Sequence, residues 1–178
     1  MRRVVVVFLV GLALAFGAFY YFSWPTTLSG SPGNAVGFDD VKPGEKLHVG
    51  LMDFTVEGRH EITIVTVKLN SPSAGIELDA ARVSLGDAGG SIGSERGDQP
   101  TVEALPRAPG AVLQSNERGT FVVSFFATAS GSFNGITITY TTGWLTRSVT
   151  LGPKVTVTVP APATTPTPSP SPSPSPSF

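Results

Sequence analysis

Apolar and polar positions alternate along most of the chain, and this pattern predicts a protein built from short β-strands. The predicted strands are rich in β-branched and aromatic residues, and turn-forming Gly, Pro, Asn and Asp separate them. They cover residues 46–52, 61–69, 76–85, 120–128, 133–141, 144–151 and 154–159. Residues 101–117 add one expected edge strand. No helical periodicity interrupts this series, so the pattern predicts an all-β, antiparallel sandwich of seven to eight strands.

The alternation changes phase inside two of these strands. In residues 61–69 the apolar positions move from Ile62 and Ile64 to Val65 and Val67. A similar change occurs near Ala81. Such a slip indicates either a β-bulge or burial on both faces of the strand.

The last part of the strand pattern resembles the closing strands of an immunoglobulin-like fold. Between Phe121 and Val159, a long apolar strand precedes one that ends at Tyr140, and a tight turn at Thr142-Gly143 leads into the final strands. Membrane-anchored or secreted bacterial proteins of unknown function carry sandwiches of this kind. The resemblance implies the fold alone. The Cys-Trp-Cys core of antibody domains is missing, so no immune-type function is implied.

A different pattern opens the chain, where residues 4–22 are apolar without a charge and follow Met1-Arg2-Arg3. About 20 apolar residues span the ~30 Å core of a bilayer as a helix. We therefore predict a cytoplasmic stub and single-pass transmembrane anchor over residues 1–23. The two arginines orient it with the N-terminus cytoplasmic and the C-terminal domain extracytoplasmic. The alternative is a signal peptide cleaved after Ala13-Leu14-Ala15, which would give a secreted protein.

The regions around the predicted sandwich (residues 43–160) differ from it in composition. Residues 24–42 are rich in Gly and Pro and are interpreted as a flexible spacer. Residues 161–178 alternate proline with Ser or Thr, which predicts a disordered tail that favours polyproline II and can accept O-linked sugars.

Charge and cysteine content narrow the function classes. Twelve Lys and Arg stand against thirteen Asp and Glu, a net charge of −1, so no nucleic-acid partner is expected. The chain has no cysteine, which excludes disulfides, thiolate metal sites and a cysteine nucleophile.

Few residues carry recognisable chemistry. Residues 89–93 match the G-x-S-x-G nucleophile elbow, but no histidine follows them and their flanks are not strand and helix. His48 and His60 lack metal-ligand spacing and are expected on the surface. The acids Asp39, Asp40 and Glu45 are expected in turns. Tyr140 and Trp144 could form a platform for a sugar, although cross-strand packing is the simpler interpretation.

The sequence therefore assigns no catalytic, cofactor or metal residue. We expect a non-catalytic, membrane-anchored, extracytoplasmic binding or envelope-assembly module, held to the membrane through residues 4–22, with an envelope protein or a glycan as its partner. One alternative is a structural spacer that presents the Pro-rich tail. Another is an envelope hydrolase whose acids, such as Asp79, Asp87 or Glu103, are brought together by the fold. The polar segment 86–100 is either a connector or a loop that contacts the partner.

Overall fold

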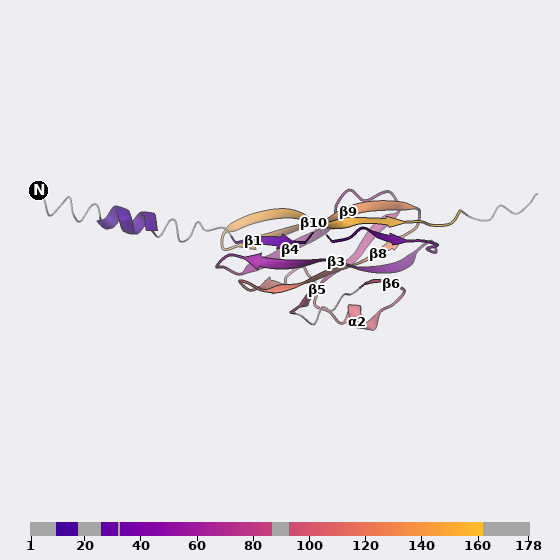
Figure 1. Cartoon of the computed structure of the whole chain (residues 1–178), viewed down its shortest axis with the longest axis horizontal. Coiled ribbons are helices and arrows are strands. Elements are labelled where there is room, and N and C mark those ends of the chain that lie inside the picture. The colour runs from indigo at the N-terminus through magenta and orange to yellow at the C-terminus, as the bar shows by residue number, and fades with distance from the viewer. Residues whose placement is uncertain (1–9, 18–25, 32, 87–92, 162–178) are drawn as a thin grey trace, which may run out of the picture.

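Two five-stranded sheets form the sandwich in a computed structural model, which describes residues 10–17, 26–31, 33–86 and 93–161 (Figure 1). Sheet A contains, in spatial order, β1 (Thr27–Gly30), β3 (Glu45–Glu57), β8 (Arg118–Ala127) and β5 (Ile76–Leu85), with β6 (Ser94–Arg96) paired to β3. Sheet B contains β2 (Val36–Phe38), β10 (Leu145–Val157), β9 (Gly131–Thr142), β4 (Ile62–Leu69) and β7 (Val112–Leu113). A one-turn helix, α2 (Pro100–Glu103), lies between β6 and β7 in the chain.

The strand order confirms the sandwich prediction, but the predicted number of seven to eight strands is wrong. The described residues form ten, because β1, β2 and β6 lie in ranges predicted as spacer and loop. The path β1-β3-β8-β5 faces a sheet that contains β4-β9-β10, which is the arrangement of the two sheets in immunoglobulin-like domains. Strand pairs are antiparallel, apart from the parallel pair β2–β10. The segment that resembled the closing strands forms β8, β9 and β10. The edge strand expected within residues 101–117 is β7.

The transmembrane helix predicted over residues 4–22 is not found, and that part of the fold prediction is wrong. The helix in the described part of the N-terminus covers residues 10–17. Among the described residues, no helix is both long and apolar enough to cross a membrane. Residues 4–9 and 18–22 lie outside the described residues.

The range predicted as a flexible spacer, residues 24–42, contains two strands instead. β1 pairs with β3, and β2 pairs with β10. Each strand contributes one large side chain to the core, Leu28 and Phe38, both 3% exposed. The two strands have four and three residues, too few for an alternating pattern to stand out among the surrounding Gly and Pro. The predicted disordered tail, residues 161–178, lies outside the described residues from 162 onward.

The core lies between the sheets and is built around phenylalanines. Phe54 and Phe121 have ring centroids 4.6 Å apart, and Phe125 meets Phe133 edge-on at 5.1 Å (all four are fully buried). Each such side chain contributes about 1.5–3 kcal/mol through burial. Phe54 and Phe121 lie on neighbouring strands of sheet A, whereas Phe125 and Phe133 belong to opposite sheets, so the second pair packs the two layers against each other.

Strand irregularities account for the phase changes in the sequence. The register between β4 and β9 shifts between Ile64 and Thr66, and that between β5 and β8 shifts between Leu78 and Ala80. These bulges confirm the first of the two interpretations. A third shift, at Leu151/Lys154, explains why residues 144–159 appeared as two strands although they form the single strand β10 with its hairpin turn. At that shift the Leu151 carbonyl approaches Gly135 so closely that a Cβ there would collide with it.

Candidate functional site

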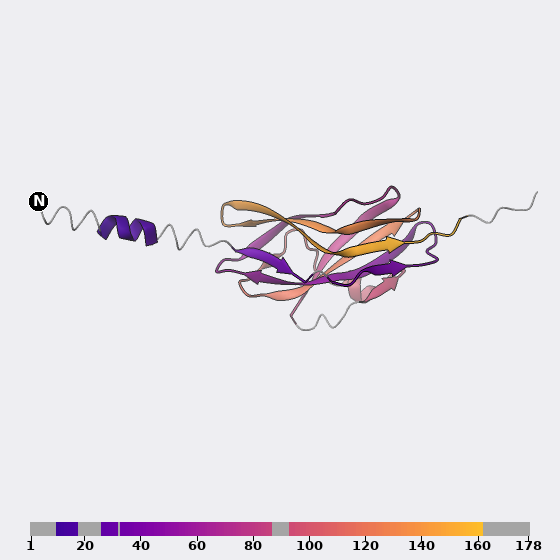
Figure 2. The same ribbon diagram turned by 45° about the horizontal axis from the view of Figure 1, so that its top comes forward.

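Residues 97–108, which we call the strap, cross part of the outer face of sheet A (Figure 2). The strap begins after β6, beside β3, and ends at the free edge of β5, where Val83 donates to the Pro106 carbonyl and Ala108 to the Ala81 carbonyl. An isolated bridge joins Arg82 to Arg107 at the same edge. Because β8 lies between β3 and β5, the strap passes over its outer side.

A second, smaller buried cluster lies under the strap. Three buried apolar side chains, Ala80, Val102 and Val122, do not belong to the core between the sheets. Val102 comes from α2, and the other two project from β5 and β8. The strap therefore excludes water from the centre of a sheet face that would otherwise be exposed.

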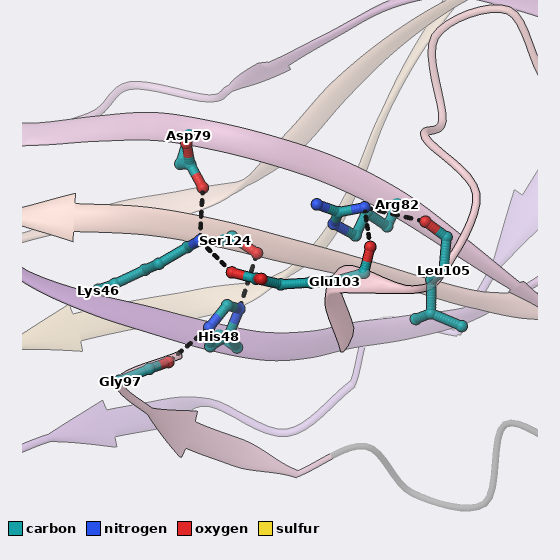
Figure 3. Close-up of polar contacts among 8 residues, drawn as sticks. All are labelled: Lys46, His48, Asp79, Arg82, Gly97, Glu103, Leu105 and Ser124. Carbon is teal, nitrogen blue, oxygen red and sulfur yellow. Dashed lines mark hydrogen bonds and ion pairs between the residues drawn. The ribbon is translucent and has the colours of Figure 1, made fainter. Parts of the chain in front are cut away.

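Two polar residues, His48 and Ser124, are buried beside this cluster (Figure 3). His48 Nδ1 lies 2.7 Å from Ser124 Oγ, and His48 Nε2 lies 2.8 Å from the Gly97 carbonyl oxygen. A carbonyl only accepts, so Nε2 carries the proton, and in the neutral ring the Ser124 hydroxyl donates to Nδ1. The surface position predicted for His48 is wrong: its side chain does point outward from β3, but the strap covers it.

A hydroxyl donating to an imidazole is also the first half of an activated nucleophile. In this chain His48 is 0% and Ser124 1% exposed. The second ring nitrogen is held by a backbone carbonyl of the strap, where catalytic triads place a carboxylate. The bonds formed here join β3, β8 and the start of the strap.

The candidate acids Asp79 and Glu103 do converge, around Lys46. Lys46 Nζ lies 3.3 Å from Asp79 Oδ2 and 2.6 Å from Glu103 Oε1 (Figure 3). The hydrogen bond and positive charge of Lys46 hold the pKa of Glu103 below its ordinary value. The hydrogen bond with Glu103, opposed by desolvation and reinforced by Asp79, raises the pKa of Lys46. Acid catalysis by a carboxylate pair needs one member protonated, whereas here the Lys46 ammonium group lies between the two acids and lowers the pKa of Glu103.

Arg82 binds the strap beside the same residue. Its Nη1 donates to the Glu103 and Leu105 carbonyl oxygens at 2.7 and 2.9 Å. Together with Lys46 it fixes the C-terminal end of α2 to sheet A. The third candidate acid, Asp87, lies outside the described residues.

The remaining sequence candidates fall into turns or outside the described chain. Glu45 accepts a bond from the Lys42 amide at 2.9 Å, which confirms its turn role, and the Asp39 carbonyl accepts from Arg96. His60 is half-buried in a turn, and its amide donates to Thr26 Oγ1. Residues 89–92 of the nucleophile-elbow match are not described. In the described ranges, no three His, Asp or Glu side chains gather in a way that could hold a metal ion.

The outer face of sheet B differs in kind, because most side chains in its middle carry a hydroxyl. We call nine positions on β4, β9 and β10 the threonine face. Strand register arranges them in three rows, each running from β10 through β9 to β4: Thr150, Thr137 and Lys68; Ser148, Thr139 and Thr66; Thr146, Thr141 and Thr63. All nine are exposed or half-buried. The sequence contained the signal, threonine at every second position of 137–141, which strand prediction used only as evidence of alternation.

The two aromatic candidates differ in burial. Tyr140 is 3% exposed, and its hydroxyl accepts a bond from the Leu28 amide at 3.3 Å, so the packing interpretation is confirmed. Trp144 is 90% exposed, and the same interpretation is wrong for it. It occupies the second position of the two-residue turn between Thr142 and Leu145, and Gly143 before it has φ 56°, as type II′ turns require. The turn therefore holds Trp144 outside the packed layers.

No protein-family model and no curated protein sequence matches the chain. Among solved structures, the ASH / PapD-like domain of human CEP192 (PapD-like domain 7) is similar over 75% of this chain and 84% of its own, with 10% identity and a TM-score of 0.37. A family 123 glycoside hydrolase from Clostridium perfringens is similar over 75% of this chain, which corresponds to 28% of that protein, with 14% identity and a TM-score of 0.40. These weak similarities concern the fold alone, and they describe a PapD-like or immunoglobulin-like β-sandwich.

Proposed function

We propose that this chain is a non-catalytic binding module that acts outside the cytoplasm and binds its partner through the threonine face. The observation that carries the proposal is the contrast between the two outer faces. On one, the strap buries the central side chains, while the nine side chains of the other remain exposed or half-buried. Arg2-Arg3 followed by an apolar segment has the composition of an export signal, which supports the extracytoplasmic location.

The polar groups of sheet A support a non-catalytic role. Lys46 already satisfies Asp79 and Glu103, and His48 and Ser124 satisfy each other beneath the strap. Each group with catalytic potential among them thus has a structural partner. Binding of a partner at the exposed threonine face needs no catalytic group.

Saturable binding of the labelled full chain to cell envelopes of the source organism tests this function. A carboxylate at the centre of the threonine face, Thr139→Glu, should lower the affinity at least about ten-fold, or about 1.4 kcal/mol, because it cannot donate and must be desolvated. Thr101→Glu, which changes an exposed threonine on α2, is the matched control. Deletion of residues 162–178 should leave binding intact. Binding that needs the tail but tolerates Thr139→Glu would instead indicate a spacer that presents the tail.

A further inference from the structure

The threonine face presents hydroxyls at a regular spacing. Neighbouring strands lie about 4.8 Å apart, and positions two residues apart on one strand lie about 7 Å apart. Seven threonines, one serine and one lysine occupy the nine positions of this grid. A partner that uses the whole face must therefore meet polar groups repeated in two directions.

Hydrogen bonds within the face fix some of these hydroxyls in advance. Thr137 Oγ1 lies 2.9 Å from Thr150 Oγ1, and Thr139 Oγ1 lies 2.9 Å from Ser148 Oγ. A hydroxyl carries one donor and two acceptor sites, so each bonded pair keeps one proton and several lone pairs for an outside partner. The face can both donate and accept hydrogen bonds along its length. The hydroxyls already paired would lose little side-chain entropy when a partner binds.

The charge of the face narrows the chemistry of that partner. Lys68 is the one charged side chain of the nine, and no carboxylate is among them. Lys154, which pairs with Asn134 beyond the Thr150–Thr137 row, is an exposed cation beside the face. Binding of nucleic acid or another polyanion relies on several cations. A strongly cationic partner would need carboxylates. The face is therefore suited to a neutral partner rich in hydroxyl groups.

A protein partner fits this face poorly. The residues that dominate protein–protein binding energies are Trp, Tyr and Arg, whereas Ser and Thr are under-represented among them. Each threonine of the face carries a methyl group as well as a hydroxyl, a mixture that matches the C–H and O–H groups on a sugar ring. Val65, 46% exposed at the β4 bulge, adds an apolar contact.

Trp144 lies at the end of β9 and β10, the strands that carry most of the face. It lies in the turn beyond the Thr142–Leu145 pair that closes the hairpin, two positions from Thr146 of the third row. An exposed indole offers a flat apolar surface and one N–H donor. Sugar rings stack on such surfaces through their C–H groups.

We propose that the threonine face, extended by Trp144, binds a neutral polysaccharide of the cell envelope. This inference rests on the proposed function and adds the class of the partner to it. The hydroxyl grid supplies paired donors and acceptors to the sugar hydroxyls, and Trp144 supplies the stacking contact at one end.

Envelope binding after two separate treatments tests the inference. Envelopes are oxidised with periodate, which cleaves sugars with adjacent hydroxyls, or digested with proteinase K, and binding of the labelled full chain is compared with untreated envelopes. A neutral polysaccharide predicts loss after periodate, retention after the protease, and equal affinity in about 0.05 and 0.5 M NaCl. Retention after periodate, loss after the protease, or weakening by salt each overturns it. Binding that survives periodate but still requires Thr139 would preserve the binding function and change the partner to a protein.

Variants locate the contact on the face. Trp144→Ala should weaken binding about five-fold through loss of the stacking contact, and Trp144→Phe should restore most of it. Thr137→Val keeps the shape of the side chain and removes a hydroxyl, and it should weaken binding by a similar factor. Thr101→Val is the matched control. Unchanged binding in both Trp144→Ala and Thr137→Val would overturn the assignment to this face.

Discussion

The two outer faces of the sandwich are both formed by strands with alternating core and outward residues, but they differ in exposure to solvent. On sheet A, the outward positions of β3, β8 and β5 carry His48, Ser124 and Arg82, and the strap buries or binds all three. On sheet B, the outward positions of β9 and β10 stay in contact with solvent. The difference comes from one connection, because the chain between β5 and β8 crosses sheet A before it returns to the core.

The comparison shows why a polar residue in a strand cannot be assigned to the surface from its neighbours alone. His48 alternates with the core residues Leu47 and Val49 as a surface residue would. Its burial depends on Gly97, a residue 49 positions away in the chain. Thr139 has the same kind of position on its strand and no such cover.

Aspartate placed at the centre of each face should produce the largest difference between them. Val122→Asp buries a carboxylate under the strap, at a position with 0% exposure, and should lower the free energy of unfolding by about 2–4 kcal/mol, because desolvation of the acid costs more than attraction to Arg82 on the neighbouring strand returns. Thr139→Asp places the same group on the open face and should cost about 1 kcal/mol or less. Urea unfolding of the full chain measures both. Similar losses in the two variants would mean that the strap does not exclude water from sheet A.

Removal of one hydroxyl from each face should give a smaller difference in the free energy of unfolding than the aspartate variants do. Ser124→Ala deprives His48 Nδ1 of its partner in a buried site, and the expected loss is about 1–3 kcal/mol. Ser148→Ala breaks the exposed bond to Thr139, so its effect should stay within about 0.5 kcal/mol. Thermal unfolding of the two variants provides the comparison. A silent Ser124→Ala would contradict the hydrogen-bond assignment of His48.

Much of the sandwich could be predicted because its strands are defined locally. The range 76–85 coincides with β5, and the phase slip in residues 61–69 marked a real bulge. β1 and β2 could not be found in this way, because a strand of three or four residues shows too few alternations. The ion pairs of the strap join positions such as Lys46 and Glu103 that only the folded chain brings together. The threonine face could have been predicted once β4, β9 and β10 were known to be neighbours.

Because the Lys46–Glu103 ion pair attaches the strap to sheet A, the stability of this attachment should depend on pH. Because the pKa of Glu103 is lowered from 4.5, the stabilisation it provides is present above that value and is lost as the pH falls through the folded-state pKa. The pKa of Lys46 is raised from 10.5, so its stabilisation is complete below 10.5 and is lost as the pH rises through the raised value. The ion pair therefore stabilises the strap fully between pH 4.5 and pH 10.5.

Hydrogen exchange of the strap amides tests this hold. At neutral pH, Glu103→Gln should speed exchange at residues 97–108 and leave the strands of sheet B unaffected, because local opening needs to release only the strap. As the pH falls through the folded-state pKa of Glu103, the difference between the variant and the parent chain should disappear. Glu77→Gln, an exposed acid on β5, is the control. A pH-independent difference would assign the effect to side-chain packing and not to the ion pair.

The smallest expected change in stability concerns the most exposed aromatic residue. Trp144→Ala should alter the free energy of unfolding by no more than about 0.5 kcal/mol, since the side chain is 90% exposed and Gly143 sets the turn. Tyr140→Phe, four residues earlier, should cost about 1 kcal/mol, because the Leu28 amide loses its acceptor in the core. Denaturant midpoints of the two variants measure the contrast. If Trp144→Ala unfolds more easily than Tyr140→Phe, the indole supports the fold. If its stability is unchanged while binding to envelopes weakens, the large apolar surface at the hairpin tip serves the partner and not the sandwich.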